Sequence, residues 1–369
     1  MTCTRRRLIE NAARASLLAP MTLAAPLKAQ APQNKLAIPG LFPGRVIAVE
    51  DRRSLSGGRY NAEFIRGMMR KGMQELTGLD WAESWKLFVQ KGERVGIKVN
   101  PVGQPHCISA PPVLHEIIDG LKAAGIRAQD IVVYDRYRRQ FHRAGFHQWL
   151  PEGVRKSAAV EDYDDIQLDI QGYDRDHYVE LPLTLPGYAN DERARRSHAA
   201  LFITKEVDKL INLCVLKDHQ SAGVTLALKN LSHGLVNNVS RSHSSKSLNA
   251  CNTFIPAVVQ MPVIRNKAVL HILDGVKGVY HGGPGARPEF VWEHYTMYFA
   301  TDPVALDHVG WRKIDEKRVA VGKKVLVEDT PDKFSTFVHR QPEHVEIAGA
   351  LGLGVWPWEK ITYRHIQLG

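Results

Sequence analysis

The most informative stretch of the chain, residues 209–219, reads Lys-Leu-Ile-Asn-Leu-Cys-Val-Leu-Lys-Asp-His. Its near-continuous apolar run, 210–216, predicts a β-strand covered on both faces, because such runs are typical of parallel sheets that lie between layers of helices. The run ends in Lys217, Asp218 and His219, residue types that a buried strand interior disfavours. The stretch therefore predicts an α/β fold with a polar site at the carboxyl end of this strand.

Strands and helices alternate on both sides of this run. Residues 94–135 show strand, helix and strand with short links, a βαβ unit that implies a parallel sheet with a right-handed crossover. We therefore predict an α/β fold with a mostly parallel sheet, flanked by helices and built from βαβ units. Residues 45–369 are expected to form a single large α/β domain, with an irregular insertion over 150–200. The predicted strands are 45–50, 94–100, 130–135, 210–216, 269–274 and 296–300, and the predicted helices are 61–77, 111–125, 303–318 and 342–351.

The first 31 residues have the pattern of a targeting segment. They resemble a twin-arginine export signal, with a basic start, an apolar stretch too short to span a bilayer and alanines at alternate positions. This resemblance implies recognition by the twin-arginine export machinery, cleavage near residues 29–31 and a periplasmic location, with a linker over 32–44. Because that route moves folded proteins, it also suits a protein that binds a cofactor or metal before export. The three parts are Thr4-Arg5-Arg6-Arg7, residues 15–27 and Ala29-Gln30-Ala31.

Composition and charge exclude several classes of protein. The 369 residues are 44% hydrophobic and 24% charged, as in ordinary globular proteins. The formal charge is +10, but the first 31 residues hold five of the positive charges and one negative charge, which leaves +6 after cleavage. No dense Lys/Arg stripe remains, so nucleic acid is not an expected partner. No second apolar segment has the length of a membrane span, so we expect no integral membrane segment in the mature chain.

The cysteines limit the redox centres that the mature chain could build. Three cysteines, Cys107, Cys214 and Cys251, remain after cleavage of the signal. The sequence allows one disulfide between two of them, which leaves at least one free thiol. A four-cysteine iron–sulfur cluster needs one more thiolate, so no self-contained cluster is expected.

Polar residues follow the predicted strands at their carboxyl ends. If the strands are parallel, these ends meet at one edge of the sheet, where open α/β proteins bind their ligands. Lys98 and Asn100 share one face of their strand, and Lys217 and His219 share one face of theirs. We therefore expect a ligand site on this edge. The polar strand ends are Asn100, Asp135-Arg136, Lys217-Asp218-His219, Asp274-Gly275 and Thr301-Asp302.

The segment after His219 extends this candidate site. Ser221 is predicted to cap a helix from about residue 222, whose free backbone N–H groups and neighbouring lysines would bind an anion. Residues 232–250 are rich in hydrogen-bonding side chains and are predicted to form either a functional lid or a mobile surface loop. Residues 280–285 form a glycine-rich loop that could bring backbone amides close to a ligand.

These positions define the candidate site residues. His219 is the expected general acid/base, because its ordinary pKa suits that role. Lys98 has an alternative structural interpretation, in which its side chain extends to solvent or pairs with a structural carboxylate. Asp302 has one as the N-cap of the helix that begins at Pro303. The metal or redox cofactor stays unresolved, because no diagnostic ligand spacing is present. Expected catalytic residues are His219, Lys217 and Lys229; expected substrate-binding residues are Lys98, Asn100, Asn230, His243, Gly282 and Gly283; and metal candidates are Asp274, Asp302 and His281.

The chain resembles a bacterial and archaeal family of unknown activity, "domain of unknown function 362". The resemblance spans about residues 45–320 and is most specific around the central Lys/His/Lys-Asn block. Some members are fused to ferredoxin modules, which implies redox chemistry, but this sequence has no such module. The similar blocks are residues 209–219, Gly223-Val-Thr-Leu-Ala-Leu-Lys-Asn230, Gly234, Gly96-Ile-Lys-Val-Asn100, Asp274-Gly275, Gly282-Gly283-Pro284 and residues 301–307.

Together these observations predict an exported, periplasmic enzyme, cofactor- or metal-assisted. It would act on a small anionic or polyhydroxylated substrate with lysine/histidine acid–base chemistry at the strand ends. An oxidoreductase and a lyase or isomerase fit equally well. The alternatives are a non-catalytic periplasmic protein that binds a ligand or metal, and a redox partner without its own iron–sulfur module.

Overall fold

The apolar run forms β9 (Lys209–His219) inside the main sheet of the computed structural model, which describes residues 34–369. The predicted export signal, residues 1–31, lies outside the described residues. The main sheet has nine strands, in the order β13-β1-β12-β11-β9-β4-β5-β6, with β10 paired to the end of β9. The remaining bounds are β1 (Arg45–Glu50), β4 (Val95–Lys98), β5 (Ile131–Tyr134), β6 (Arg155–Ser157), β10 (Gly223–Val224), β11 (Ala268–Val279), β12 (Val291–Ala300) and β13 (Thr362–Gln367).

The predicted parallel pairing is confirmed for most of this sheet. The run β11-β9-β4-β5-β6 is parallel throughout, and β1 pairs with β13 in parallel. β4, α4 (Pro111–Ala123) and β5 form the predicted βαβ unit. The carboxyl ends of β4, β5 and β9 therefore lie at one edge of the sheet.

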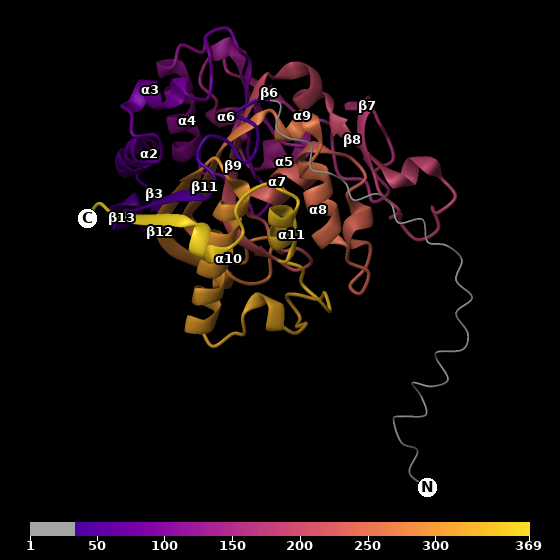
Figure 1. The fold of residues 1–369 in the computed structure, drawn as a ribbon. Helices are drawn as coiled ribbons and strands as arrows, with labels where there is room; N and C mark the ends of the chain where they lie inside the picture. The colour runs from indigo at the N-terminus through magenta and orange to yellow at the C-terminus, as the bar shows by residue number, and fades with distance from the viewer. Residues whose placement is uncertain (1–33) are drawn as a thin grey trace. The chain divides into compact units, whose positions relative to one another are not determined.

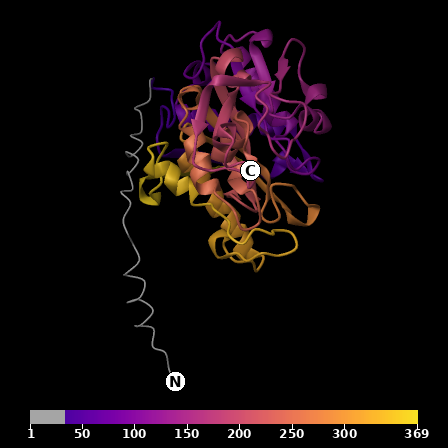
Figure 2. The same cartoon turned by 90° about the vertical axis from the view of Figure 1, so that its right-hand side faces the viewer.

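Helices cover both faces of the sheet, as predicted for an α/β fold (Figure 1). One core cluster joins the sheet to α2, α3 and α4, and the other joins it to α7, α8, α10 and α11. Figure 2 shows the yellow α11 next to α8, in agreement with their contacts. The helices are α2 (Ala62–Thr77), α3 (Trp81–Lys86), α5 (Arg138–Arg143), α6 (Phe146–Trp149), α7 (Leu226–Leu235), α8 (Cys251–Val259), α9 (Pro262–Arg265), α10 (Pro303–Ala320) and α11 (His344–Ala350).

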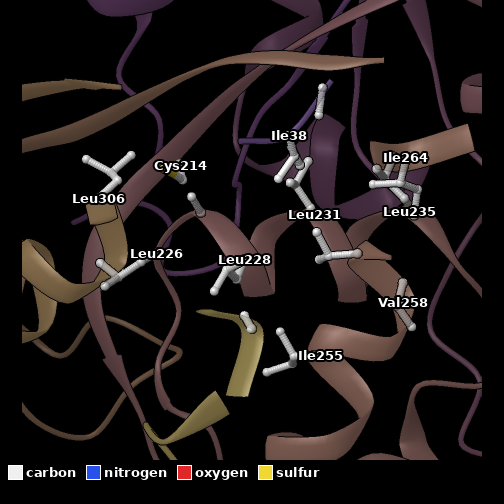
Figure 3. Close-up of a cluster of buried hydrophobic side chains, with 14 of the residues drawn as sticks. Ile38, Cys214, Leu226, Leu228, Leu231, Leu235, Ile255, Val258, Ile264 and Leu306 are labelled. Atoms are coloured by element: carbon white, nitrogen blue, oxygen red, sulfur yellow. The ribbon is translucent and has the colours of Figure 1, made fainter. Parts of the chain in front are cut away.

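Strand alternation decides which side chains reach the site. Val95 and Ile97 of β4 pack into the α2–α4 side of the core, so Lys98 points to the opposite face, toward α7. On that face, α7 and α8 pack through apolar side chains. Figure 3 shows Leu228 of α7 among these residues, close to Ile255 of α8. The polar face of α7 is thereby directed to the end of β4.

One predicted strand end lies elsewhere. β12 is antiparallel to both β11 and β1, so its carboxyl end lies at the edge opposite to the ends of β4, β5 and β9. Thr301 and Asp302 therefore do not converge with Lys217 and His219, and the expectation that they would is wrong. Asp302 instead caps α10, where its carboxylate accepts from the N–H groups of Val304 and Ala305 at 2.9 Å each.

Residues 150–200 contribute β6, the last strand of the sheet, and a separate hairpin. That hairpin pairs β7 (Tyr173–Glu180) with β8 (Arg196–Ala200), and a second small hairpin pairs β2 (Leu55–Ser56) with β3 (Arg59–Tyr60). Over residues 34–369, no helix is both long and apolar enough to cross a membrane.

Candidate functional site

A cavity of about 260 Å³ lies where β4, β5 and β9 end against α7. Its wall combines the strand ends with α7 and the segment that follows that helix. The charged or imidazole side chains in the wall are Lys98, Asp135, Arg136, Lys217, His219, Lys229, His233 and His243. The cavity thus brings together all three expected catalytic residues and four of the expected substrate-binding residues, Lys98, Asn100, Asn230 and His243.

Lys98 is a fully bonded, buried cation. Its ammonium donates to Asp135 Oδ1 at 2.7 Å, to the carbonyl of Val99 at 2.5 Å and to Asn230 Oδ1 at 3.3 Å. All three N–H bonds of the ammonium therefore have acceptors. This geometry agrees with the structural interpretation of Lys98 as the partner of a carboxylate. Lys98 and Asp135 also line the cavity, so the pair belongs to the site as well.

Two asparagines connect Lys98 to the second lysine. Asn100 Nδ2 donates to Asn230 Oδ1 at 3.1 Å, and Asn100 Oδ1 accepts from the Lys217 ammonium at 2.8 Å. Asn230 donates in turn to Asn212 Oδ1 at 2.7 Å. Because each amide has its partners fixed, the chain of hydrogen bonds sets the positions of both lysines.

Lys217 is completely buried and has two acceptors, Asn100 Oδ1 and the carbonyl of Val102. Burial, with a contribution from the nearby charges of Lys229 and Lys98, lowers the pKa of Lys217 to about 7. Its amine therefore exchanges a proton near neutral pH, which is the property required of a general acid or base.

Lys229 differs from both. Its side chain is 8% exposed and lines the cavity, yet no hydrogen bond or ion pair within residues 34–369 reaches its amine. Burial, above all, and the charges of Arg136 and Lys98 lower the pKa of Lys229 to about 8. A buried polar group without a protein partner is unusual and indicates a group that meets a ligand.

The orientation of His219 is set by the turn that follows β9. Its Nδ1 accepts from the backbone N–H groups of Ser221 at 3.1 Å and Ala222 at 3.2 Å. In the neutral ring this places the proton on Nε2, the nitrogen left for the cavity. Burial, with the charges of Lys229 and other neighbours, holds the pKa of His219 well below its ordinary value. This geometry favours a fixed hydrogen-bond donor; the acid–base role expected for His219 stays a prediction.

Two more imidazoles complete this wall. The ring centroids of His219 and His243 lie 6.1 Å apart, and those of His233 and His243 lie 5.5 Å apart. Burial and the Lys229 charge lower the pKa of His243 to about 4 and the pKa of His233 well below its ordinary range. Both rings are therefore neutral near pH 7 and add no further positive charge.

The predicted anion site at a helix start differs from the structure. α7 begins at Leu226, not near residue 222, and the carboxylate of Asp307 accepts from the N–H groups of Ala227 at 2.7 Å and Leu228 at 2.8 Å. These helix-start donors are occupied by a residue of α10. Ser221 does not cap the helix; its hydroxyl lies 2.9 Å from His219 Nδ1.

The glycine-rich loop, residues 280–285, packs against the end of β9. Gly283 donates its N–H to Asp218 Oδ1 at 2.9 Å, and a side chain there would collide with the Asp218 backbone. Pro284, and neither Gly282 nor Gly283, lines the cavity. Gly283 therefore packs closely against the end of β9, whereas Gly282 lies near Phe290, and the substrate-binding role expected of both glycines stays a prediction.

The three metal candidates are not brought together. Asp274 accepts from the Tyr60 hydroxyl and the N–H of Ala110, both at 3.0 Å, and Asp302 caps α10. His281 contacts Asp332 at 2.7 Å. In the described part of the chain, no three His, Cys, Asp or Glu side chains are grouped to hold a metal ion. Cys107, Cys214 and Cys251 are buried free thiols.

Sequence reasoning marked Asp135 and Arg136 as strand-end residues without giving them a role. Arg136 donates to the Tyr173 hydroxyl and the carbonyl of His233 at 3.1 Å each, and to Gln167 Oε1 at 2.5 Å. Its partners are neutral, so its charge adds to that of the lysines. Gly234 was also missed as a positioning residue: an added Cβ would lie 2.1 Å from Lys98 Cε.

Comparisons with known proteins agree with the sequence resemblance. The family described as "Domain of unknown function (DUF362)" matches residues 95–312, more than half of the chain. The matched residues include the three lysines of the cavity, Lys98, Lys217 and Lys229. No curated protein matches the sequence. A crystal structure of a protein from Thermotoga maritima aligns with 61% of this chain at 8% identity and a TM-score of 0.32. The aligned part is about half of that protein, 52% of its chain.

Proposed function

This chain belongs to the DUF362 family, a domain family of unknown function, and we propose that it is an enzyme that acts on a small anionic molecule in the lysine cavity. The observation that carries the proposal is the charge of the wall. Four cationic side chains, Lys98, Arg136, Lys217 and Lys229, face one cavity, and Asp135 is the one carboxylate among the described residues that line it.

An excess of positive charge in a buried site is unfavourable unless an anion offsets it. Lys98 and Asp135 neutralise each other, and among residues 34–369 no carboxylate pairs with Arg136, Lys217 or Lys229. Carboxylate or phosphate oxygens would supply the missing acceptors. A volume of about 260 Å³ is below the range of about 300–1,000 Å³ typical of drug-sized ligands, so the proposed substrate is small.

The proposed chemistry is proton transfer by Lys217. With two acceptors fixed and a pKa of about 7, its amine can take up and return a proton near neutral pH without rearrangement of the wall. His219 would donate from Nε2 to an oxygen of the substrate, because its Nδ1 is held by backbone N–H groups. Lys98 would hold Asn230, and through it Asn100, in place.

Anion binding and proton transfer can be tested separately. We expect oxalate, pyruvate or inorganic phosphate, each near neutral pH, to raise the Tm of the mature protein, whereas uncharged glycerol leaves it unchanged. We expect proton NMR in D2O to show protein-dependent exchange of the methyl protons of pyruvate, lost in Lys217→Met. Stabilisation without exchange of any C–H in a panel of small acids would instead favour the non-catalytic ligand-binding alternative. No stabilisation by any of these anions would refute the proposal.

We also propose that the protein works in the periplasm after twin-arginine export. The support is the sequence pattern of residues 1–31, with its paired arginines and alternate alanines. Cell fractionation of the full chain tests this, because replacement of Arg5 and Arg6 by lysine should retain the uncleaved protein in the cytoplasm. Equal amounts of both forms in the periplasm would refute the export route.

A further inference from the structure

The three cavity lysines differ in how many acceptors each amine has. Lys98 has three, so its ammonium is complete and has no free position. Lys217 has two, Asn100 Oδ1 and the carbonyl of Val102. Lys229 has none within residues 34–369, although it is almost fully buried and lines the cavity. The protein thus fixes two amines and leaves the third free to react.

The neighbours of Lys229 favour its uncharged form. It lines the cavity together with the neutral rings of His219, His233 and His243. Burial is the largest cause that lowers the pKa of Lys229 to about 8, and the positive charges of Arg136 and Lys98 add to it. A lysine amine that is desolvated beside other cations is the kind that serves as a nucleophile toward carbonyl groups.

We propose that Lys229 forms an imine with the carbonyl carbon of a substrate that also bears an anionic group, such as a small 2-oxo acid. This inference rests on the proposed function, because Arg136 would hold the anionic group while Lys229 reaches the carbonyl. The assignment makes Lys229 a catalytic residue and names the class of substrate that the cavity takes.

The step balances with groups of the cavity. The neutral Lys229 amine attacks the carbonyl carbon, a C–N bond forms, and the electron pair of the C=O bond moves to oxygen. Lys217, protonated at the start, gives its proton to this oxygen, which His219 Nε2–H also hydrogen-bonds. Lys217 then takes one proton from the nitrogen and passes it to the resulting hydroxyl group, which leaves as water. The products are a positively charged imine that keeps one N–H, one water molecule and a neutral Lys217, with no oxidation or reduction. Lys217 can afterwards remove a proton from the carbon next to the imine, which the positive nitrogen acidifies.

Reductive trapping tests this assignment directly. The mature protein is incubated with pyruvate or glyoxylate and sodium borohydride, digested, and its modified peptides are identified by mass spectrometry. We expect one reduced adduct per chain, on Lys229, and its yield should fall when excess oxalate competes for the cavity. The wild-type protein suffices for this mapping, so the result does not depend on whether a variant folds.

Two variants supply matched controls. Lys229→Arg keeps the charge but cannot form an imine, and we expect at least a tenfold loss of trapping. Lys122→Arg changes an exposed lysine at the end of α4 and should trap as the wild type does. Circular dichroism and Tm of each variant show whether it is folded.

The outcomes separate this inference from the proposed function. If oxalate and pyruvate stabilise the protein but no adduct forms on Lys229, or the adduct lies on another lysine, the inference is overturned and the anion site stands. If no anion stabilises the protein and nothing is trapped, both fail. An adduct on Lys229 that oxalate suppresses supports both.

Discussion

The first prediction concerns the buried ion pair between Lys98 and Asp135: removal of the Lys98 ammonium should lower the free energy of unfolding of the protein. Lys98 and Asp135 are 2.7 Å apart, and their side chains are only 2% and 6% exposed. Lys98→Met has a similar length and leaves Asp135 as a buried, unpaired charge. Breaking a buried pair in this way typically costs about 3–5 kcal/mol of the free energy of unfolding. We expect a loss in that range, measured by urea unfolding near pH 7.

Two controls make this prediction specific. The double variant Lys98→Met/Asp135→Asn buries no charge and should recover at least half of the loss, since the unpaired carboxylate is gone. Lys86→Met breaks an ion pair with Glu83 whose side chains are 49% and 57% exposed, so its cost should be at most about 1 kcal/mol. A cost for Lys98→Met equal to that for Lys86→Met, or no recovery in the double variant, would refute the account of Lys98 as a paired, buried cation.

Three further predictions concern packing, titration and helix capping. Gly234→Ala should destabilise the protein by about 1–3 kcal/mol in urea unfolding because it displaces Lys98, whereas Gly67→Ala in α2, which has open space, should stabilise it by about 0.5–1 kcal/mol. Between about pH 7 and 10.5, the free energy of unfolding of the wild type should rise relative to that of Lys217→Met. In this window the unfolded chain binds a proton on Lys217 that the folded protein has lost, so a higher pH favours the folded state. Parallel pH profiles of the two proteins would contradict this. Asp307→Ala should cost about 1–3 kcal/mol by leaving the first N–H groups of α7 without an acceptor, and thermal unfolding that matches the wild type would contradict that role.

Local sequence patterns predicted the strands near the site because neighbouring residues determine these strands. The apolar run of β9 and the alternation in β4 place Lys98, Asn100, Lys217 and His219 at one edge of a parallel sheet, and this is where the structure has them. The failure at Asp302 followed from predicted strands that were too short. The predicted strands 269–274 and 296–300 leave 21 residues between them, which is enough for a parallel crossover. In the structure both strands are longer, and the link between β11 and β12 is only 11 residues, 280–290, with no α-helix in its described structure, whereas a parallel crossover needs about a dozen residues or more and usually an α-helix.

Other features depend on residues far apart in the chain, so no local pattern could predict them. The start of α7 is capped by Asp307, about 80 residues later, in place of the adjacent Ser221. His281 contacts Asp332, and Asp274 accepts from Tyr60, so each candidate has a distant partner, and the described residues do not group these candidates around one metal position. Strand-end position identified Asp135 and Arg136, but only their contacts show that one offsets Lys98 and the other adds to the positive charge.

The geometry of the site also links its occupancy to the stability of the fold. Asp135 offsets the charge of Lys98, but the other acceptors of Lys98 and Lys217 are the amides of Asn100 and Asn230 and the carbonyls of Val99 and Val102, which bring no net negative charge. The cationic excess of the wall therefore opposes folding in the ligand-free protein, and burial makes this cost larger than it would be at the surface. An anion that binds the folded cavity removes part of that cost in addition to its direct contacts. Binding and stability should for this reason rise together across a series of anions ordered by charge, and Lys217→Met, which removes one of the cations, should weaken both trends.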